Sequence, residues 1–76
     1  MRHLPEPILP DHWIAQIFSA RIAAEGGIVR RKVTDVERLI GRDRFAHEVR
    51  RRGYTAVENG GQFVIFCNVE PIKILS

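Results

Sequence analysis

A dense run of positive charge lies in the middle of the chain, and the chemistry it offers is the binding of anions. Between Arg30 and Arg52 there are nine arginine or lysine residues against four acids, a local net charge of 9 − 4 = +5. The whole chain carries +3, so the remaining residues sum to 3 − 5 = −2. Cationic groups concentrated in this way are typical of a surface that binds a polyanion.

The second half of this run predicts a helix that turns basic side chains outward. Asp43 is the predicted N-cap and Gly53 the predicted end. At about 100° per residue, Phe45 and Val49 form an apolar stripe that has Ala46 at its side. Opposite the stripe lie three residues that are basic or can become so, with Arg50 at the margin: Arg44, His47 and Arg51.

A second interpretation of the same helix is purely structural. Basic residues near a helix C-terminus interact favourably with the helix dipole and are often simply solvated. Glu48 also stands four residues from both Arg44 and Arg52, a spacing that allows an ion pair with either one. The charge count, rather than the helix by itself, favours the binding interpretation.

A shorter helix is predicted just before the basic one. Thr34 and Glu37 have the spacing of a capping box, in which each side chain binds the backbone amide of the other residue. Val36, Leu39 and Ile40 then recur on one face. Gly41 is the predicted stop, which leaves about two turns of helix and a joint of about residues 41–42.

The beginning of the chain predicts an arm and then a helix. Residues 1–10 contain three prolines, which favour an extended and flexible segment. Asp11 is the predicted N-cap of a helix from His12 to about Glu25, which ends at the glycine pair 26–27. Its apolar residues are predicted to enter the core: Trp13, Ile14, Ile17, Phe18 and Ile22.

Three short strands are predicted: 27–32, 54–58 and 62–68. Asn59-Gly60 between the last two predicts a hairpin with a type I′ turn, and Gly61 suggests a bulge or a longer loop. The third strand is apolar on both faces, so we expect helices on one face and a partner subunit on the other. The segment Ile72–Leu75 is also apolar and predicts a docked tail or an edge strand, which again favours a homodimer.

No pattern of catalysis or metal binding accompanies these elements. His3, His12 and His47 are far apart in the sequence, and Cys67 is the only cysteine and lies in an apolar strand. The glycine pairs lack the sequence of a phosphate-binding loop. We therefore expect no enzyme activity, no cofactor and no metal. No signal peptide or membrane segment is recognisable, which favours a cytoplasmic protein.

The order of the predicted elements resembles the winged helix-turn-helix superfamily. The resemblance rests on TDVERLIG, RDRFAHEVRRRG and ENGGQ, and spans roughly residues 11–68. It implies an α+β domain of order α-β-α-α-β-β over residues 11–76. The joint between the two helices departs from the pattern, because it is shorter than the three or four residues usual in such turns.

The resemblance also implies a function, namely transcription regulation through duplex DNA. The helix from about Asp43 to Arg52 would be the recognition helix. Arg44, His47 and Arg51 would face the major groove. Phosphates would be bound by Arg38, Arg42 and Arg50, and the tip of the wing would consist of Asn59, Gly60 and Gln62. The alternative is a small dimeric α+β interaction module that binds an acidic protein partner, and RNA is a third ligand class.

Overall fold

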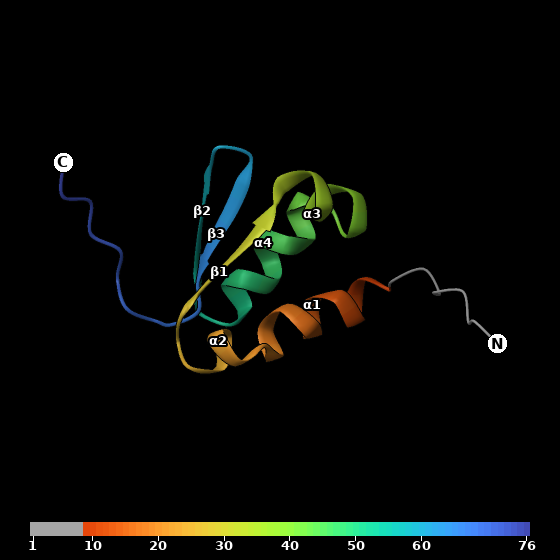
Figure 1. Cartoon of the computed structure of the whole chain (residues 1–76), viewed down its shortest axis with the longest axis horizontal. Coiled ribbons are helices and arrows are strands. Elements are labelled where there is room, and N and C mark those ends of the chain that lie inside the picture. The colour runs from red at the N-terminus through yellow and green to blue at the C-terminus, as the bar shows by residue number, and fades with distance from the viewer. Residues whose placement is uncertain (1–8) are drawn as a thin grey trace.

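Helices and strands follow one another in the order α-α-β-α-α-β-β in residues 9–76, the part of the chain that this computed structural model describes (Figure 1). They are α1 (Pro10–Ser19), α2 (Arg21–Ala24), β1 (Ile28–Lys32), α3 (Val33–Leu39), α4 (Arg42–Arg51), β2 (Thr55–Asn59) and β3 (Gln62–Phe66). The predicted α+β class is confirmed, with one additional short helix. Most of the predicted arm lies outside the described residues, and Pro10 is already helical.

The three strands form one antiparallel sheet of order β1-β3-β2. Strand β3 is central, and its Ile65 lies opposite Val29 of β1 and Ala56 of β2. The basic residues Arg30–Lys32 belong to β1 itself, within the strand predicted at 27–32. The helices cover one face of the sheet, because Val29 and Ile65 belong to the same buried cluster as residues of α1, α3 and α4.

The single N-terminal helix that the sequence predicted is broken in two. Ala20 has extended backbone, with ψ of 150°, between α1 and α2. Just before it, the Ser19 hydroxyl donates to the carbonyl of Gln16, a local bond that competes with helix continuation. After the break, Ala23 is the buried residue of α2. Ile22, which was predicted to enter the core, is instead 55% exposed.

Three predicted helix caps are wrong. Helix α1 begins at Pro10 rather than after Asp11, and α4 begins at Arg42 rather than after Asp43. Helix α3 begins at Val33, so Thr34 lies inside its first turn and makes no capping bond. Strand β1 runs directly into α3, and the Val33 amide donates at 2.9 Å to the carbonyl of Gly61 in the hairpin. A tertiary bond thus satisfies the amide at the start of α3.

The hairpin is present, but its turn is one residue further along than predicted. Asn59 and Gln62 are paired across the strands, so the two central residues are Gly60 and Gly61. Their φ angles are +57° and +78°, the positive values at both central positions that a type I′ turn requires. Gly61 is therefore part of the turn and not a bulge.

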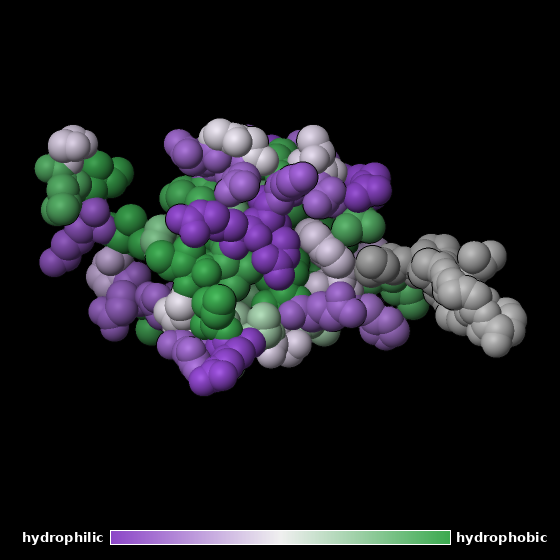
Figure 2. Space-filling model, in the orientation of Figure 1, coloured by the Kyte–Doolittle hydropathy of each residue, from purple (hydrophilic) through white to green (hydrophobic). Residues whose placement is uncertain are grey.

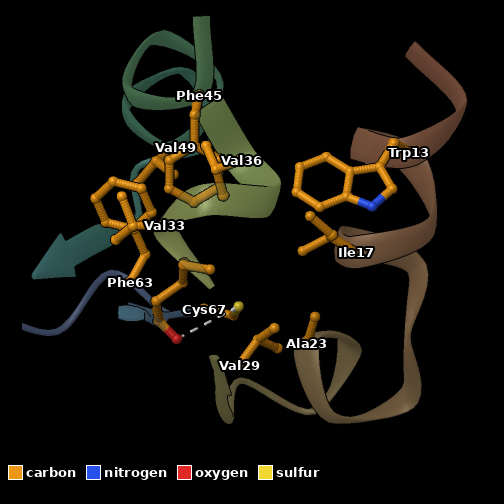
Figure 3. Packing of buried hydrophobic residues seen from close by; sticks show 11 residues of the cluster. Trp13, Ile17, Ala23, Val29, Val33, Val36, Phe45, Val49, Phe63 and Cys67 are labelled. Atoms are coloured by element: carbon orange, nitrogen blue, oxygen red, sulfur yellow. Dashed lines mark hydrogen bonds between the residues drawn. The ribbon is translucent and has the colours of Figure 1, made fainter. Parts of the chain in front are cut away.

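The core lies between the sheet and the helices. Trp13 and Ile17 of α1 point toward Val36 of α3, and Phe45 of α4 packs on Phe63 of β3 (Figure 3). The two phenyl rings are stacked with centroids 4.9 Å apart. Cys67 is buried in this cluster as predicted, and its burial raises the pKa of the thiol. No buried side-chain nitrogen or oxygen of the described residues lacks a hydrogen-bond partner.

The C-terminal tail, residues 69–76, is neither docked nor part of the sheet, which corrects the prediction for Ile72–Leu75. It extends away from the body of the domain (Figure 1). Ile74 is 86% exposed and Leu75 is 95% exposed. Among the helices of residues 9–76, none has the length and apolar character needed to cross a membrane.

Candidate nucleic-acid interface

Helix α4 is anchored by its apolar stripe and exposes the face opposite to it. Phe45 and Val49 are buried against the sheet. Arg44, His47, Arg50 and Arg51 are all exposed, as their positions on the helix predict. The short joint with α3 is made by residues 40–41, and Gly41 has a φ of +85° there, a conformation that suits glycine.

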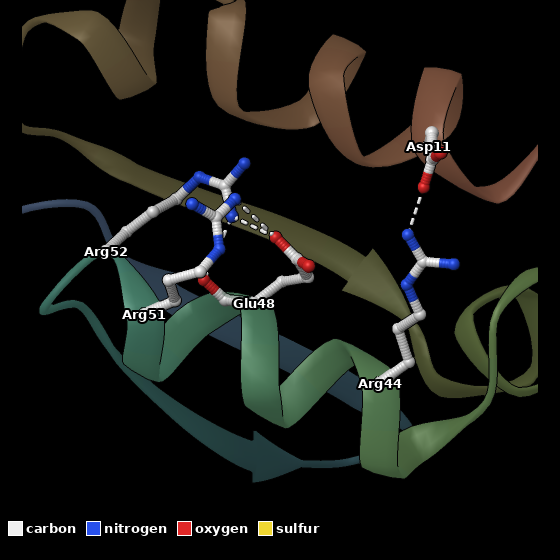
Figure 4. Close-up of polar contacts among 5 residues, drawn as sticks. All are labelled: Asp11, Arg44, Glu48, Arg51 and Arg52. Atoms are coloured by element: carbon white, nitrogen blue, oxygen red, sulfur yellow. Dashed lines mark hydrogen bonds and ion pairs between the residues drawn. The ribbon is translucent and has the colours of Figure 1, made fainter.

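Two of the exposed arginines of α4 are engaged in ion pairs (Figure 4). Arg44 pairs with Asp11 of α1, and Arg51 pairs at 2.9 Å with Glu48. Glu48 also accepts from Arg52 at 2.6 Å, and these bonds, first from Arg52 and then from Arg51, lower the pKa of Glu48 to about 2. The sequence left Arg44 and Arg52 open as partners of Glu48, and the structure selects Arg52.

The predicted phosphate contacts Arg38 and Arg42 are paired as well. Arg38 binds Asp35 at 3.0 Å within α3. Arg42 binds Glu58 of β2 at 2.5 Å and Glu37 of α3 at 3.3 Å, and its guanidinium lies 5.1 Å from the ring centre of Phe63. The bonds to Glu58 and then Glu37 raise the pKa of Arg42. This side chain joins three elements, so its role is structural even where its edge is open to solvent.

Five of the nine cations between Arg30 and Arg52 therefore have an acidic partner. The remaining four have no ion-pair partner within residues 9–76, and neither has His47. They are Arg50 on α4 and Arg30, Arg31 and Lys32 on β1. Arg30 and Lys32 lie on the open face of the sheet, because they pair with Val64 and Gln62 of β3.

The three β1 cations were counted in the sequence but not among the site residues. For Arg30 and Lys32 the signal is the alternation within IVRRK. In that segment Val29 must face the core, so Arg30 and Lys32 must face solvent, whereas Arg31 shares the face of Val29 and is half-buried.

The tip of the hairpin is exposed and uncharged. Asn59 and Gly60 are exposed and Gln62 is half-buried. The tip is held by the bond from Val33 to Gly61, and the pair of Arg42 and Glu58 brings it near the beginning of α4. Arg50 and Arg51 lie at the other end of α4. The structure therefore divides the predicted set between the two ends of one helix.

A groove of about 480 Å³ runs between α4 and the edge strand β2. Its apolar lining includes Phe45, Ala46, Val49 and Ala56. Arg42 and Arg50 contribute to it from the two ends of the helix. The groove thus joins an apolar surface to one paired cation, one unpaired cation and the carboxylate of Asp43.

Within residues 9–76, no three histidine, cysteine or acidic side chains come together as a metal site. In comparisons with known proteins, no protein-family model, no curated protein and no solved structure matches the chain.

Proposed function

We propose that this chain is a non-enzymatic protein of the cytoplasm that binds duplex DNA as a small transcriptional regulator. Helix α4 is the basic helix that approaches the duplex, and the β2–β3 hairpin is the wing beside it. The element order supports this proposal through its resemblance to winged helix-turn-helix proteins. A similar fold alone does not define a function, so the proposal depends mainly on the charged surface.

One observation carries the proposal: the exposed surface of α4 presents basic side chains that have no acidic partner within residues 9–76. Phe45 and Val49 fix the orientation of the helix, which places His47 on the face opposite them. Arg50 is exposed at the margin of that face, where it also lines the groove beside β2. Arg44 and Arg51 flank them, and their side chains remain 43% and 57% exposed despite their ion pairs. Such exposed pairs are weak and can yield to phosphate.

The ion pairs divide the predicted contacts into two groups. Arg50 and His47 can bind phosphate or a base edge without breaking a contact of the described fold. Arg44 and Arg51 must first leave Asp11 and Glu48. Arg38 must likewise leave Asp35, and Arg42 is the least available of this paired group, because two carboxylates hold it at once. We therefore place Arg50 at the centre of the interface.

The test is the salt dependence of binding to duplex DNA of random sequence. Each phosphate neutralised contributes about −0.9 to the slope of log affinity against log salt concentration. Arg50→Ala is expected to reduce the magnitude of that slope by about 0.9 and to weaken binding to all sequences alike. Titration by fluorescence anisotropy at several salt concentrations measures both quantities.

Arg21→Ala is the matched control. Arg21 is an exposed arginine of α2 that pairs with Glu25, away from α4. The Arg21→Ala substitution removes one positive charge, as Arg50→Ala does. An equal loss of slope in both variants would mean that the effect comes from the overall charge and not from the position of Arg50. Wild-type protein that binds no duplex at low salt would exclude the proposal.

The acidic-protein alternative has its own supporting observation. Arg30, Arg31 and Lys32 form a second group of unpaired cations on β1, remote from β2, which α4 contacts. Binding that responds to Arg30→Ala and not to Arg50→Ala would place the anion on this strand. An acidic peptide beside β1 would then be the better ligand.

A further inference from the structure

We propose that the C-terminal tail, residues 69–76, of one copy adds as a strand to the edge of β2 in a second copy. Ile72 and Ile74 would then fill the groove between α4 and β2. The exchange is mutual, so it closes a symmetric dimer. This proposal is independent of DNA binding.

The tail has the composition of a segment that is buried elsewhere. Of the eight large hydrophobic residues that are exposed in residues 9–76, four belong to it: Val69, Ile72, Ile74 and Leu75. Figure 2 shows these apolar side chains standing clear of the body at one end of the molecule. Scattered exposed hydrophobics are ordinary, but four within seven residues form a concentrated apolar segment, densest at Ile72–Leu75. Residues 69–76 belong to no helix and no strand of their own chain, so their backbone is available for pairing with another strand.

Strand β2 offers the backbone that such a segment needs. It is at the edge of the sheet, with β3 on one side, so alternate amides and carbonyls on its other side are open to a further strand. Strand β1 is the other edge, but Arg30, Arg31 and Lys32 crowd it with positive charge. Charged side chains on an edge discourage pairing, so β2 is the better acceptor.

The groove next to β2 matches the tail in length and in chemistry. Four extended residues span about 13 Å, and the wall of α4 from Arg42 to Arg50 rises about 12 Å. Side chains of a strand alternate between its two faces, so Ile72 and Ile74 point the same way and Lys73 points the other way. Lys73 is charged, so it stays in solvent while the apolar side chains turn toward the apolar lining of the groove. The two isoleucines therefore face Ala46, Val49 and Ala56, and Leu75 joins the exposed Val57 on the open face of the sheet.

The first experiment measures the oligomeric state of the full chain by sedimentation over a range of concentrations. Wild-type protein is expected to dimerise, and Ile74→Asp to raise the dimer dissociation constant at least ~tenfold, because a carboxylate would replace an apolar side chain against Ala46, Val49 and Ala56. Ile22→Asp is the matched control: it makes the same substitution at an exposed isoleucine of α2, outside the groove. Both residues are exposed, and circular dichroism verifies that the variants fold.

A second variant tests the groove and the exchange together. Ala46→Glu keeps a good helix former and fills the groove, so it is also expected to be monomeric. When Ala46→Glu and Ile74→Asp are mixed, the intact tail of the former meets the intact groove of the latter. The mixture is therefore expected to form heterodimers that neither variant forms alone, with one of the two contacts restored.

Three results would overturn the proposal. A wild-type chain that stays monomeric at high concentration has no second copy to bind. Equal effects of Ile74→Asp and Ile22→Asp would show association without a specific tail contact. A mixture that recovers no dimer would show that the tail of one copy does not enter the groove of another. Duplex binding by Ile74→Asp separates the two proposals, since this variant removes no cation from α4.

Discussion

At the scale of single residues, Glu48 shows how ion pairs engage the arginines of this chain. Its side chain is 12% exposed and accepts hydrogen bonds from Arg51 and Arg52 on the last turn of α4. Arg52 in turn lies 4.4 Å from the ring centre of Phe18, which ties the C-terminal end of α4 to α1. Arg52 is thus held in place by an acidic side chain and an aromatic ring. Its charge is not free for a ligand.

The depressed pKa of Glu48 predicts a pH-dependent contribution to stability. The pKa is about 2 in the folded chain, below its ordinary value of 4.5. A depressed carboxyl pKa stabilises the fold above the ordinary value, and the contribution is lost as the pH falls from about 4.5 through about 2. Because Arg51 is solvated, we expect a contribution on the order of 1 kcal/mol. The free energy of unfolding of Glu48→Gln, measured with urea, should be lower than that of wild type at pH 7 and equal to it near pH 2. A difference that does not depend on pH would contradict this account.

The sequence could predict some of these residue contacts and not others. Glu48 and Arg52 are four residues apart on one helix, so their pair follows from helix geometry. The pairs of Arg44 with Asp11 and of Arg42 with Glu58 join residues 33 and 16 positions apart. They depend on how α1 and β2 dock on α4, which no local pattern contains. For this reason the exposed positions of α4 were predicted correctly and the free charges were not.

At the scale of elements, the misplaced boundaries have a common cause. The sequence assigned local side-chain caps at Asp11, Thr34 and Asp43, but no capping bond forms at α1, α3 or α4. At α3 the amide that needs a partner finds Gly61 of the hairpin instead. A contact across 28 residues (61 − 33) replaces a contact across three. The helix ends at Gly41 and Gly53 were predicted well, because positive φ is a local property of glycine.

The hairpin turn supplies a prediction at this scale. Gly60 has a φ of +57°, and a side chain there would meet no atom within 4 Å. The cost of a substitution is therefore purely one of backbone conformation. Gly60→Val is expected to lower the free energy of unfolding by about 1–2 kcal/mol, because a β-branched residue is strained at positive φ. Gly60→Asn is the matched control, since asparagine tolerates this conformation, and it should stay close to wild type in urea unfolding. Equal stabilities of the two variants would argue against the turn.

At the scale of the whole molecule, the sheet has two unlike faces. Phe63, Ile65 and Cys67 of β3 and the segment after it are buried under the helices. Val64 and Phe66 on the opposite face are half-buried, and Val57 beside them is 41% exposed. The alternation of β3 predicted this division, and its apolar outer face predicted a further cover. What the sequence could not predict is the groove, because it arises from the docking of α4 on β2.

A chain of 76 residues has little stability to lose, and its single core makes that loss predictable. Typical values per residue place the free energy of unfolding at roughly 4–11 kcal/mol. Ile65 is fully buried in β3 and belongs to the one core cluster that the sheet and the helices form together. Ile65→Ala is expected to cost about 2–5 kcal/mol, through lost burial and the cavity left behind.

The control is Val57→Ala on the open face of the sheet, compared at the lower protein concentration because Leu75 of a second copy would contact Val57; there it should cost less than about 1 kcal/mol. Thermal unfolding of both variants at two protein concentrations distinguishes the effect of core packing on the melting temperature from the effect of association. Ile65→Ala must lower the melting temperature by a similar amount at either concentration, because its cavity lies inside one copy. If the tail exchange holds, wild-type protein melts higher at the greater concentration, because a dimer stabilises the folded chain by mass action. Equal losses at residues 65 and 57 would mean that the helices do not cover the face assigned to them.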